Sequence, residues 1–273
     1  MAFVSTRARL IVARCLCLLA LAAWAPACAS GPKKPPVGAE EPDKFLFEHG
    51  TTALNDRRWF VAREFFRQLM DSYPQSTYRP DAKLGIGDSY LGEGSLEAQV
   101  LAINEFREFL AYYPTHERAH YAQYKLGMAH YYQMRGAARD QTETKEAIKE
   151  LTIYVQRYKD KPLFAEASER LREAKDRLSD HEYGVGLFYL RSRMSIPGAL
   201  DRFNSILKTD PEYSRRDAVY YQMAQALVQA GQPAAAIPFL DKLLTEFEQS
   251  EYLERAREQI AELKVQMQAQ IKK

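Results

Sequence analysis

The sequence predicts an all-α protein, an α-solenoid in which five helical hairpins stack side by side. The first observation is a spacing: an alanine is followed four residues later by an aromatic residue and twelve residues later by a proline. It occurs as Ala62/Phe66/Pro74, Ala102/Phe106/Pro114 and Ala199/Phe203/Pro211. Weaker copies begin at Ala147 and Ala236, where leucine replaces the aromatic residue. Because proline cannot continue a helix, each of the three full copies is expected to form a helix with a defined end.

The second observation is a small residue upstream of each copy. These residues are Gly50, Gly87, Gly127, the Gly184/Gly186 pair and Ala224. A helix–turn–helix repeat of about 34 residues places small residues where its two helices cross. The five copies therefore predict tetratricopeptide-like hairpins, which can bury their apolar faces only by stacking on one another.

Composition and charge narrow the class of protein. Of the 273 residues, 46% are hydrophobic, which is ordinary for a soluble domain. Three arginines lie in the first 27 residues, so the remainder holds 38 − 3 = 35 basic and 36 acidic residues, a net charge of −1. Nucleic-acid binders carry a basic face, so we expect no nucleic-acid partner.

The first 27 residues have the pattern of a secretory signal peptide. Arginines are followed by an apolar run from Cys15 to Trp24, which is too short to span a bilayer permanently. Two cleavage interpretations remain open. The Ala25-x-Ala27 pattern suits ordinary signal peptidase, whereas small residues before Cys28 resemble a bacterial lipobox. The lipobox is favoured, because ordinary cleavage would leave Cys28 as an unpaired thiol in an oxidising compartment.

Lipidation at Cys28 would anchor the protein to a membrane. Residues 28–43 are rich in proline and glycine and predict a lipidated flexible tether. Ala29 stands where an aspartate would favour the inner membrane, so we expect the periplasmic face of the outer membrane.

The remaining chain divides into two predicted parts. Residues 44–162 hold repeats one to three, and the third has a long polar insertion between its helices. Residues 163–273 hold a linking helix, repeats four and five and a C-terminal capping helix. The linking helix carries an apolar stripe from Phe164 to Leu178 and is predicted to continue into repeat four near Tyr183. The capping helix is expected from Glu251 to about Gln270.

One motif suggests an enzyme. His116-Glu117-Arg118-Ala119-His120 satisfies H-E-x-x-H, in which two histidines on one helix bind zinc and the glutamate activates water. The motif begins two residues after Pro114, where a helix is only starting. We therefore expect His116 to lie in a turn, and we expect no catalytic residue, metal or cofactor.

The first helices of the hairpins predict a binding groove. Counting from the glycines, repeat positions two, five, nine and twelve line the concave wall of such a solenoid. The resulting groove would be aromatic and apolar and would suit an extended peptide with aromatic residues. The alternative is that these side chains pack between the layers. The predicted groove residues are Leu84, Leu91, Tyr121, Tyr124, Met128 and Tyr131.

Several stretches together resemble the BamD family of outer-membrane assembly lipoproteins. They are Tyr73-Pro74-x-Ser76-x-Tyr78, Tyr113-Pro114-x-His116, Arg139-Asp140-Gln141-Thr142, Asp176-Arg177-Leu178 with His181-Glu182, and the run from Val185 through Phe188-Tyr189 to Arg193, Ala199 and Arg202. The resemblance covers roughly residues 44–247. Pro26 and Ala25 depart from the usual residues of the lipobox.

The resemblance implies a non-catalytic, lipid-anchored scaffold of the machinery that folds β-barrels into the outer membrane. Its N-terminal repeats would receive the aromatic C-terminal signal of unfolded outer-membrane proteins. Its C-terminal repeats would contact the POTRA region of a BamA-like insertase, with other assembly lipoproteins as further partners. Arg193 and Arg202 stand where the family places arginines in the insertase contact.

Two other hypotheses remain. The first is a different periplasmic repeat lipoprotein, a scaffold for envelope organisation or export. The second is a zinc peptidase that uses His116, Glu117 and His120.

Overall fold

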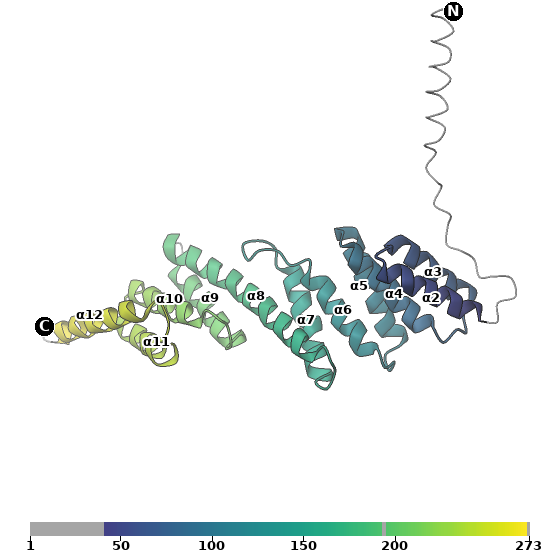
Figure 1. The fold of residues 1–273 in the computed structure, drawn as a ribbon. Helices are drawn as coiled ribbons and strands as arrows, with labels where there is room; N and C mark the ends of the chain where they lie inside the picture. The colour runs from purple at the N-terminus through teal and green to yellow at the C-terminus, as the bar shows by residue number, and fades with distance from the viewer. Residues whose placement is uncertain (1–40, 193–194, 272–273) are drawn as a thin grey trace, which may run out of the picture.

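The computed structural model describes residues 41–192 and 195–271, and every regular element in these ranges is an α-helix. The helices form a single row of hairpins, so the molecule is elongated (Figure 1). The prediction of an all-α solenoid is confirmed. In each hairpin we call the first helix the A helix and the second the B helix.

The first three hairpins are α2–α3, α4–α5 and α6–α7. Pro42 occupies the first turn of α2, where its missing N–H costs nothing, so this helix begins two residues before the predicted start of repeat one. The bounds are α2 Pro42–Asn55, α3 Trp59–Ser72, α4 Arg79–Glu93, α5 Leu96–Tyr112, α6 Ala119–Tyr131 and α7 Thr142–Arg157.

The second half is organised by one long helix. The linking helix and the A helix of repeat four are continuous, and together they form the 29-residue helix α8. Within the described ranges, no helix is both long and apolar enough to cross a membrane. The bounds are α8 Phe164–Ser192, α9 Ile196–Thr209, α10 Arg216–Gln229, α11 Pro233–Glu246 and the capping helix α12 Leu253–Ile271.

Small residues stand at the helix crossings, as the repeat pattern predicts. A Cβ atom on Gly87 would lie 2.7 Å from the ring of Phe106, and one on Gly186 would lie 2.6 Å from Phe203. Both rings are completely buried. The glycine lets the A helix approach the aromatic residue of the B helix, which explains why the two residue types recur together. The same contact pairs Gly50 with Phe66 and Gly127 with Leu151.

The turns between consecutive hairpins share one hydrogen-bond pattern. At the first turn the Ser76 N–H donates to the Tyr73 carbonyl at 3.0 Å, and the Arg79 N–H donates to the Ser76 carbonyl at 3.4 Å. The following A helix therefore starts at the same distance from each turn. The residues equivalent to Ser76 are His116, Lys161, Tyr213 and Ser250.

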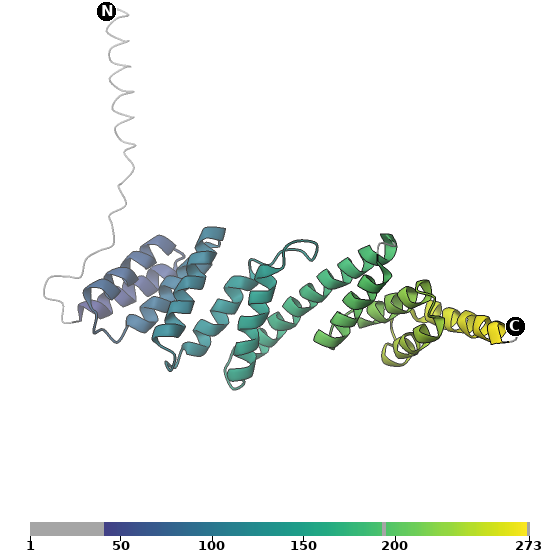
Figure 2. The same cartoon turned by 180° about the vertical axis from the view of Figure 1, so that it is seen from behind.

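The apolar core is interrupted in the middle of α8. One cluster fills repeats one and two up to α6, and a second joins α6 and α7 to Ala167 and Leu171 of α8. A third begins at Tyr183 of α8 and runs to α12. Figure 2 shows α8 between the N-terminal and C-terminal hairpins. The first two clusters meet in α6. The apolar core therefore forms two stretches, one on each side of the middle of α8.

The long insertion of repeat three packs against the middle of α8. Arg177 donates to the Arg135 carbonyl at 2.9 Å, and Nδ1 of His181 lies 2.6 Å from the Ala137 carbonyl oxygen. Gln141 is buried and donates to the carbonyls of Gly136 and Arg139 inside the insertion. Two of the sequence motifs that resemble the BamD family, 139–142 and 176–182, therefore belong to one contact region.

Candidate functional site

The A helices place the six predicted groove residues in two different environments. Leu84 is completely buried, and Tyr124 and Met128 are 5% and 3% exposed. These three side chains pack between repeats, so the structure does not present them to a peptide. Leu91, Tyr121 and Tyr131 are partly exposed.

At the repeat position of Leu84 and Tyr124, other repeats make a stacking contact with the residue before the next A helix. Both residues occupy the fifth position of the repeat. In repeat one the fifth residue, Phe47, stacks on Tyr78, just before the next A helix, with ring centroids 5.0 Å apart. In repeat five Tyr221 stacks in the same way on Tyr252 at 4.7 Å. The fifth position is thus a packing position between consecutive hairpins.

The partly exposed tyrosines are held by carboxylates of neighbouring repeats. The Tyr121 hydroxyl lies 2.9 and 3.0 Å from the two carboxylate oxygens of Asp88, and Arg118 forms an ion pair with Asp81 at 2.7 Å. Burial and the nearby Asp88 carboxylate raise the pKa of Tyr121, so its hydroxyl stays protonated and donates. Lys125 forms an ion pair with Asp88 at 3.6 Å and lies over the Tyr121 ring.

A second tyrosine, at the end of α6, is fixed in the same manner by a carboxylate of α8. The hydroxyl of Tyr131 donates to Glu173, which also forms an ion pair with Arg170 at 2.9 Å. Burial and the bond to Glu173 raise the pKa of Tyr131. We call Leu91, Tyr121 and Tyr131, with the carboxylates Asp88 and Glu173, the A-helix face. Its aromatic rings are oriented before any ligand arrives.

The arginine predicted for a partner contact lies on α9. Arg202 is exposed and forms an ion pair with Glu182 of α8 at 2.7 Å, and this bond raises the pKa of Arg202. Arg193, the other predicted arginine, and the predicted lipidation site Cys28 lie outside the described residues.

Two cavities flank the Arg202–Glu182 pair. One, of about 420 Å³, is lined by Tyr189, Ser195, Gly198, Asp201, Arg202 and Ser205. The other, of about 290 Å³, opens between α7, α8 and α9 and has an apolar floor of Ile148, Leu178 and Ile206. Lys145, Lys175 and Glu182 stand among its polar walls. We call Arg202, Glu182 and these two cavities the arginine surface.

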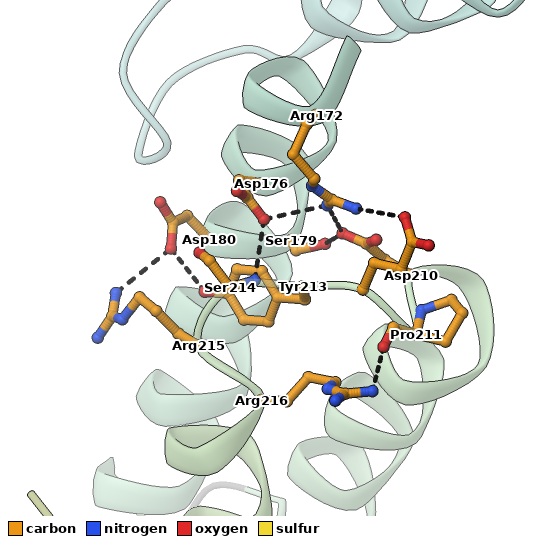
Figure 3. Close-up of polar contacts among 11 residues, drawn as sticks. Arg172, Asp176, Ser179, Asp180, Asp210, Pro211, Tyr213, Ser214, Arg215 and Arg216 are labelled. Carbon is orange, nitrogen blue, oxygen red and sulfur yellow. Dashed lines mark hydrogen bonds and ion pairs between the residues drawn. The ribbon is translucent and has the colours of Figure 1, made fainter. Parts of the chain in front are cut away.

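Sequence reasoning missed a polar cluster that attaches α8 to the turn between α9 and α10 (Figure 3). Asp210 is 6% exposed and accepts hydrogen bonds from Arg172 at 2.5 Å and from Ser179 at 2.7 Å. Tyr213 donates to Asp180 at 2.6 Å, beside these bonds. Burial alone would raise the pKa of Asp210, but the bonds from Arg172 and Ser179 hold it below its usual value.

The repeat register indicates only that α8 is irregular at Arg172. Eleven residues after the central turn residue, the other A helices have Gly87, Gly127 or Ala224 at the crossing. The same count from Lys161 arrives at Arg172. A long charged side chain cannot lie under a crossing helix, so this register excludes a hairpin crossing there.

The H-E-x-x-H motif does not have zinc-protease geometry. His116 lies in the turn, where its Nδ1 accepts from the Arg118 N–H at 3.2 Å, and α6 begins only at Ala119. Its two histidines are therefore not one helical turn apart on a common helix, which the motif requires. Burial lowers the pKa of His120. Among the described residues, no three His, Cys, Asp or Glu side chains form a group that could hold a metal ion.

Helical hairpins stacked in a row define a helical-repeat protein. A family profile described as "YfiO: Outer membrane lipoprotein" matches residues 39–237, which is 199 of the 273 residues. The chain belongs to this family, the BamD family of outer-membrane lipoproteins.

Curated relatives agree. The chain is 27% identical over 213 residues to "Outer membrane protein assembly factor BamD" of Caulobacter vibrioides, covering 77% of this chain and 68% of the relative. It is also 27% identical over 195 residues to the factor of that name from Vibrio cholerae, covering 68% and 78%. Among solved structures, the TPR2AB domain of yeast Sti1 in complex with pHSP90 is 12% identical, with a TM-score of 0.39 over 81% of this chain and 98% of that one.

Proposed function

We propose that this protein is a non-catalytic scaffold lipoprotein that acts in the assembly of outer-membrane proteins. The observation that supports this most is the family match across residues 39–237, with relatives named as assembly factors. The geometry of the H-E-x-x-H segment disfavours the peptidase alternative.

The scaffold is anchored through Cys28 at the periplasmic face of the outer membrane. In the sequence, an apolar run and small residues precede this cysteine, which is the last of the three in the chain. Two or more acyl chains hold a protein stably on a bilayer, whereas one chain gives only marginal binding. Residues 29–41 then connect the anchor to α2.

The A-helix face binds the aromatic C-terminal segment of an unfolded outer-membrane protein. Tyr121 and Tyr131 offer ring surfaces that are already oriented by Asp88 and Glu173, so little side-chain freedom is lost on binding. Leu91, on α4, adds a partly exposed apolar side chain. The buried residues Leu84, Tyr124 and Met128 act indirectly, by keeping consecutive repeats in register.

The arginine surface binds a folded partner, a BamA-like insertase. Arg202 is already charge-paired with Glu182, so a partner carboxylate can bind it only by sharing or replacing that bond. Charge-assisted bonds of this kind give orientation as well as affinity. Arg193 is the second arginine of this contact, and other assembly lipoproteins bind elsewhere on the solenoid.

The test is co-purification of the full-length, affinity-tagged chain from bacterial membranes, followed by mass spectrometry. We expect a large outer-membrane barrel protein to be recovered at a stoichiometric level. Recovery should drop with Arg202→Glu and persist with the matched variant Arg257→Glu, which changes an exposed arginine on α12. Recovery of cell-envelope organising or export proteins without any barrel protein would contradict the proposal and favour the alternative scaffold.

A further inference from the structure

Exposed apolar side chains gather where the A and B helices of repeats one and two meet. Phe60, in the first turn of α3, is 65% exposed, and Leu96, which begins α5, is 58% exposed. Val100 and Leu101, one turn further along α5, are 48% and 43% exposed. These four residues are half of the large apolar side chains that are exposed in the described residues.

Trp59 places the start of α3 against Gly92, four residues before Leu96. Its ring lies against Gly92 at the end of α4, so closely that a Cβ on this glycine would be 2.7 Å from the indole. An ion pair between Arg63 of α3 and Glu93 at 2.7 Å makes the same connection. We call Phe60, Leu96, Val100 and Leu101 the apolar edge.

Beside the apolar edge two ion pairs lie within the chain, and Glu97, next to Leu96, is exposed. Arg58 is paired with Asp56 at 2.9 Å, and Glu93 is paired with Arg63. The exposed Arg57 remains beside Phe60, in a left-handed backbone conformation with φ of 58°. A protein partner selected by charge would find little to bind here. A bilayer needs only apolar side chains that reach below the headgroups and a cation that stays among them.

The segment between Cys28 and α2 is long enough for this edge to reach a membrane. The thirteen residues 29–41 can span at most about 45 Å. The edge lies at the far end of α2, a helix of 14 residues and about 21 Å. An anchor at Cys28 therefore leaves enough chain for the end of α2 to reach the same bilayer.

We propose that the apolar edge is a second membrane contact, which inserts into the bilayer interface and orients repeats one and two on the membrane. This inference rests on the proposed anchor at Cys28 for its orientation. The partition of the edge itself into lipid needs no acylation. Repeats one and two would lie against the bilayer, whereas the lipid alone would leave the solenoid free to rotate.

The chain carries its own reporter for the test. Its two tryptophans are Trp24, in the predicted signal peptide, and Trp59, beside the apolar edge. The acylated mature chain is reconstituted into phosphatidylethanolamine–phosphatidylglycerol vesicles that contain bromine-labelled lipids, and tryptophan quenching is measured. We expect quenching in the natural chain, loss of quenching in Phe60→Ser/Val100→Ser, and retained quenching in Tyr112→Ser. Tyr112 is 73% exposed at the opposite end of α5.

A second arm separates this inference from the anchor. The full mature chain with Cys28→Ala is mixed with the same vesicles and sedimented. The intact edge should raise the bound fraction about tenfold over the double serine variant. Equal sedimentation of the two proteins, or no quenching of Trp59, would overturn the membrane contact even if Cys28 is acylated. A concentration-dependent dimer that Phe60→Ser dissociates would also overturn it, because the edge would then bind a second copy.

Discussion

The two halves of the solenoid use the same repeat to display different chemistry. In repeat three, the hydroxyls of Tyr121 and Tyr131 bind carboxylates of neighbouring helices, and their partly exposed rings form an ordered aromatic face. In repeat four, Arg202 and Glu182 pair beside two cavities. Both halves rest on the same glycine–aromatic crossings, and the polar cluster around Asp210 separates them. The comparison shows that the buried positions determine the repeat fold, whereas the exposed positions differ between the halves.

The largest effect is expected from the crossings that both halves share. Phe106→Ala removes a completely buried ring from its place against Gly87, so the free energy of unfolding should fall by about 3–5 kcal/mol. Urea unfolding followed by circular dichroism measures this loss. Tyr112→Ala, on the exposed surface of the same helix, should change it by no more than about 0.5 kcal/mol. Similar losses in both variants would contradict the role of the crossing.

A smaller effect is expected at the polar cluster between the halves. Asp210→Asn weakens the bonds from Arg172 and Ser179 to a buried acceptor and should cost about 1–3 kcal/mol at pH 7. Because the folded pKa of Asp210 is depressed, its contribution is full above the unfolded value of about 3.9 and is lost as the pH falls through the lower folded pKa.

Urea unfolding of natural chain and variant between pH 7 and pH 3 measures this dependence. The difference in stability should shrink below about pH 4. Asp241→Asn, an exposed carboxylate on α11, is the control and should show little difference at either pH. A difference that grows on acidification would contradict the sign of the Asp210 effect.

On the N-terminal half, Tyr121→Phe removes the hydroxyl that donates to Asp88. Loss of this bond should lower the free energy of unfolding by about 0.5–1.5 kcal/mol. Tyr132→Phe, on a neighbouring exposed tyrosine, should leave it nearly unchanged. If the two variants are equally stable, the hydrogen bond does not order the A-helix face.

The smallest effect concerns the glycine pair of α8. Gly184→Ala places a methyl group where no atom lies within 4 Å and should stabilise the helix by about 0.5–1 kcal/mol. Gly186→Ala should destabilise it, because its Cβ would lie 2.6 Å from Phe203. Thermal unfolding of the two variants should shift in opposite directions. A shift in the same direction would mean that Gly186 is not the crossing residue.

The sequence predicted the fold because its decisive residues are local and periodic. Gly87 and Phe106 belong to one hairpin, and their spacing alone predicts that they meet. Of the Gly184/Gly186 pair, only the structure identifies Gly186 as the crossing residue. The turn position of His116 was also predictable, because Pro114 ends the preceding helix.

The exposure of the candidate site was harder to predict. Leu84 and Tyr124 occupy positions expected to face a groove, yet both are buried in the stacked repeats. The bond between Arg172 and Asp210 joins residues 38 positions apart across an irregular repeat. Such pairs depend on the superhelical geometry, which no local spacing specifies.

The central claim is that the A-helix face and the arginine surface bind different partners. The direct test measures the binding of an aromatic-ended peptide and the binding of a BamA-like insertase. Both are measured for the variants Tyr131→Ala and Arg202→Glu at two ionic strengths. Tyr131→Ala should weaken the peptide alone, because apolar area is lost. Arg202→Glu should weaken the insertase alone, and that interaction should fall more steeply with salt. If each substitution weakens both interactions equally, the two surfaces are not separate and the account is wrong.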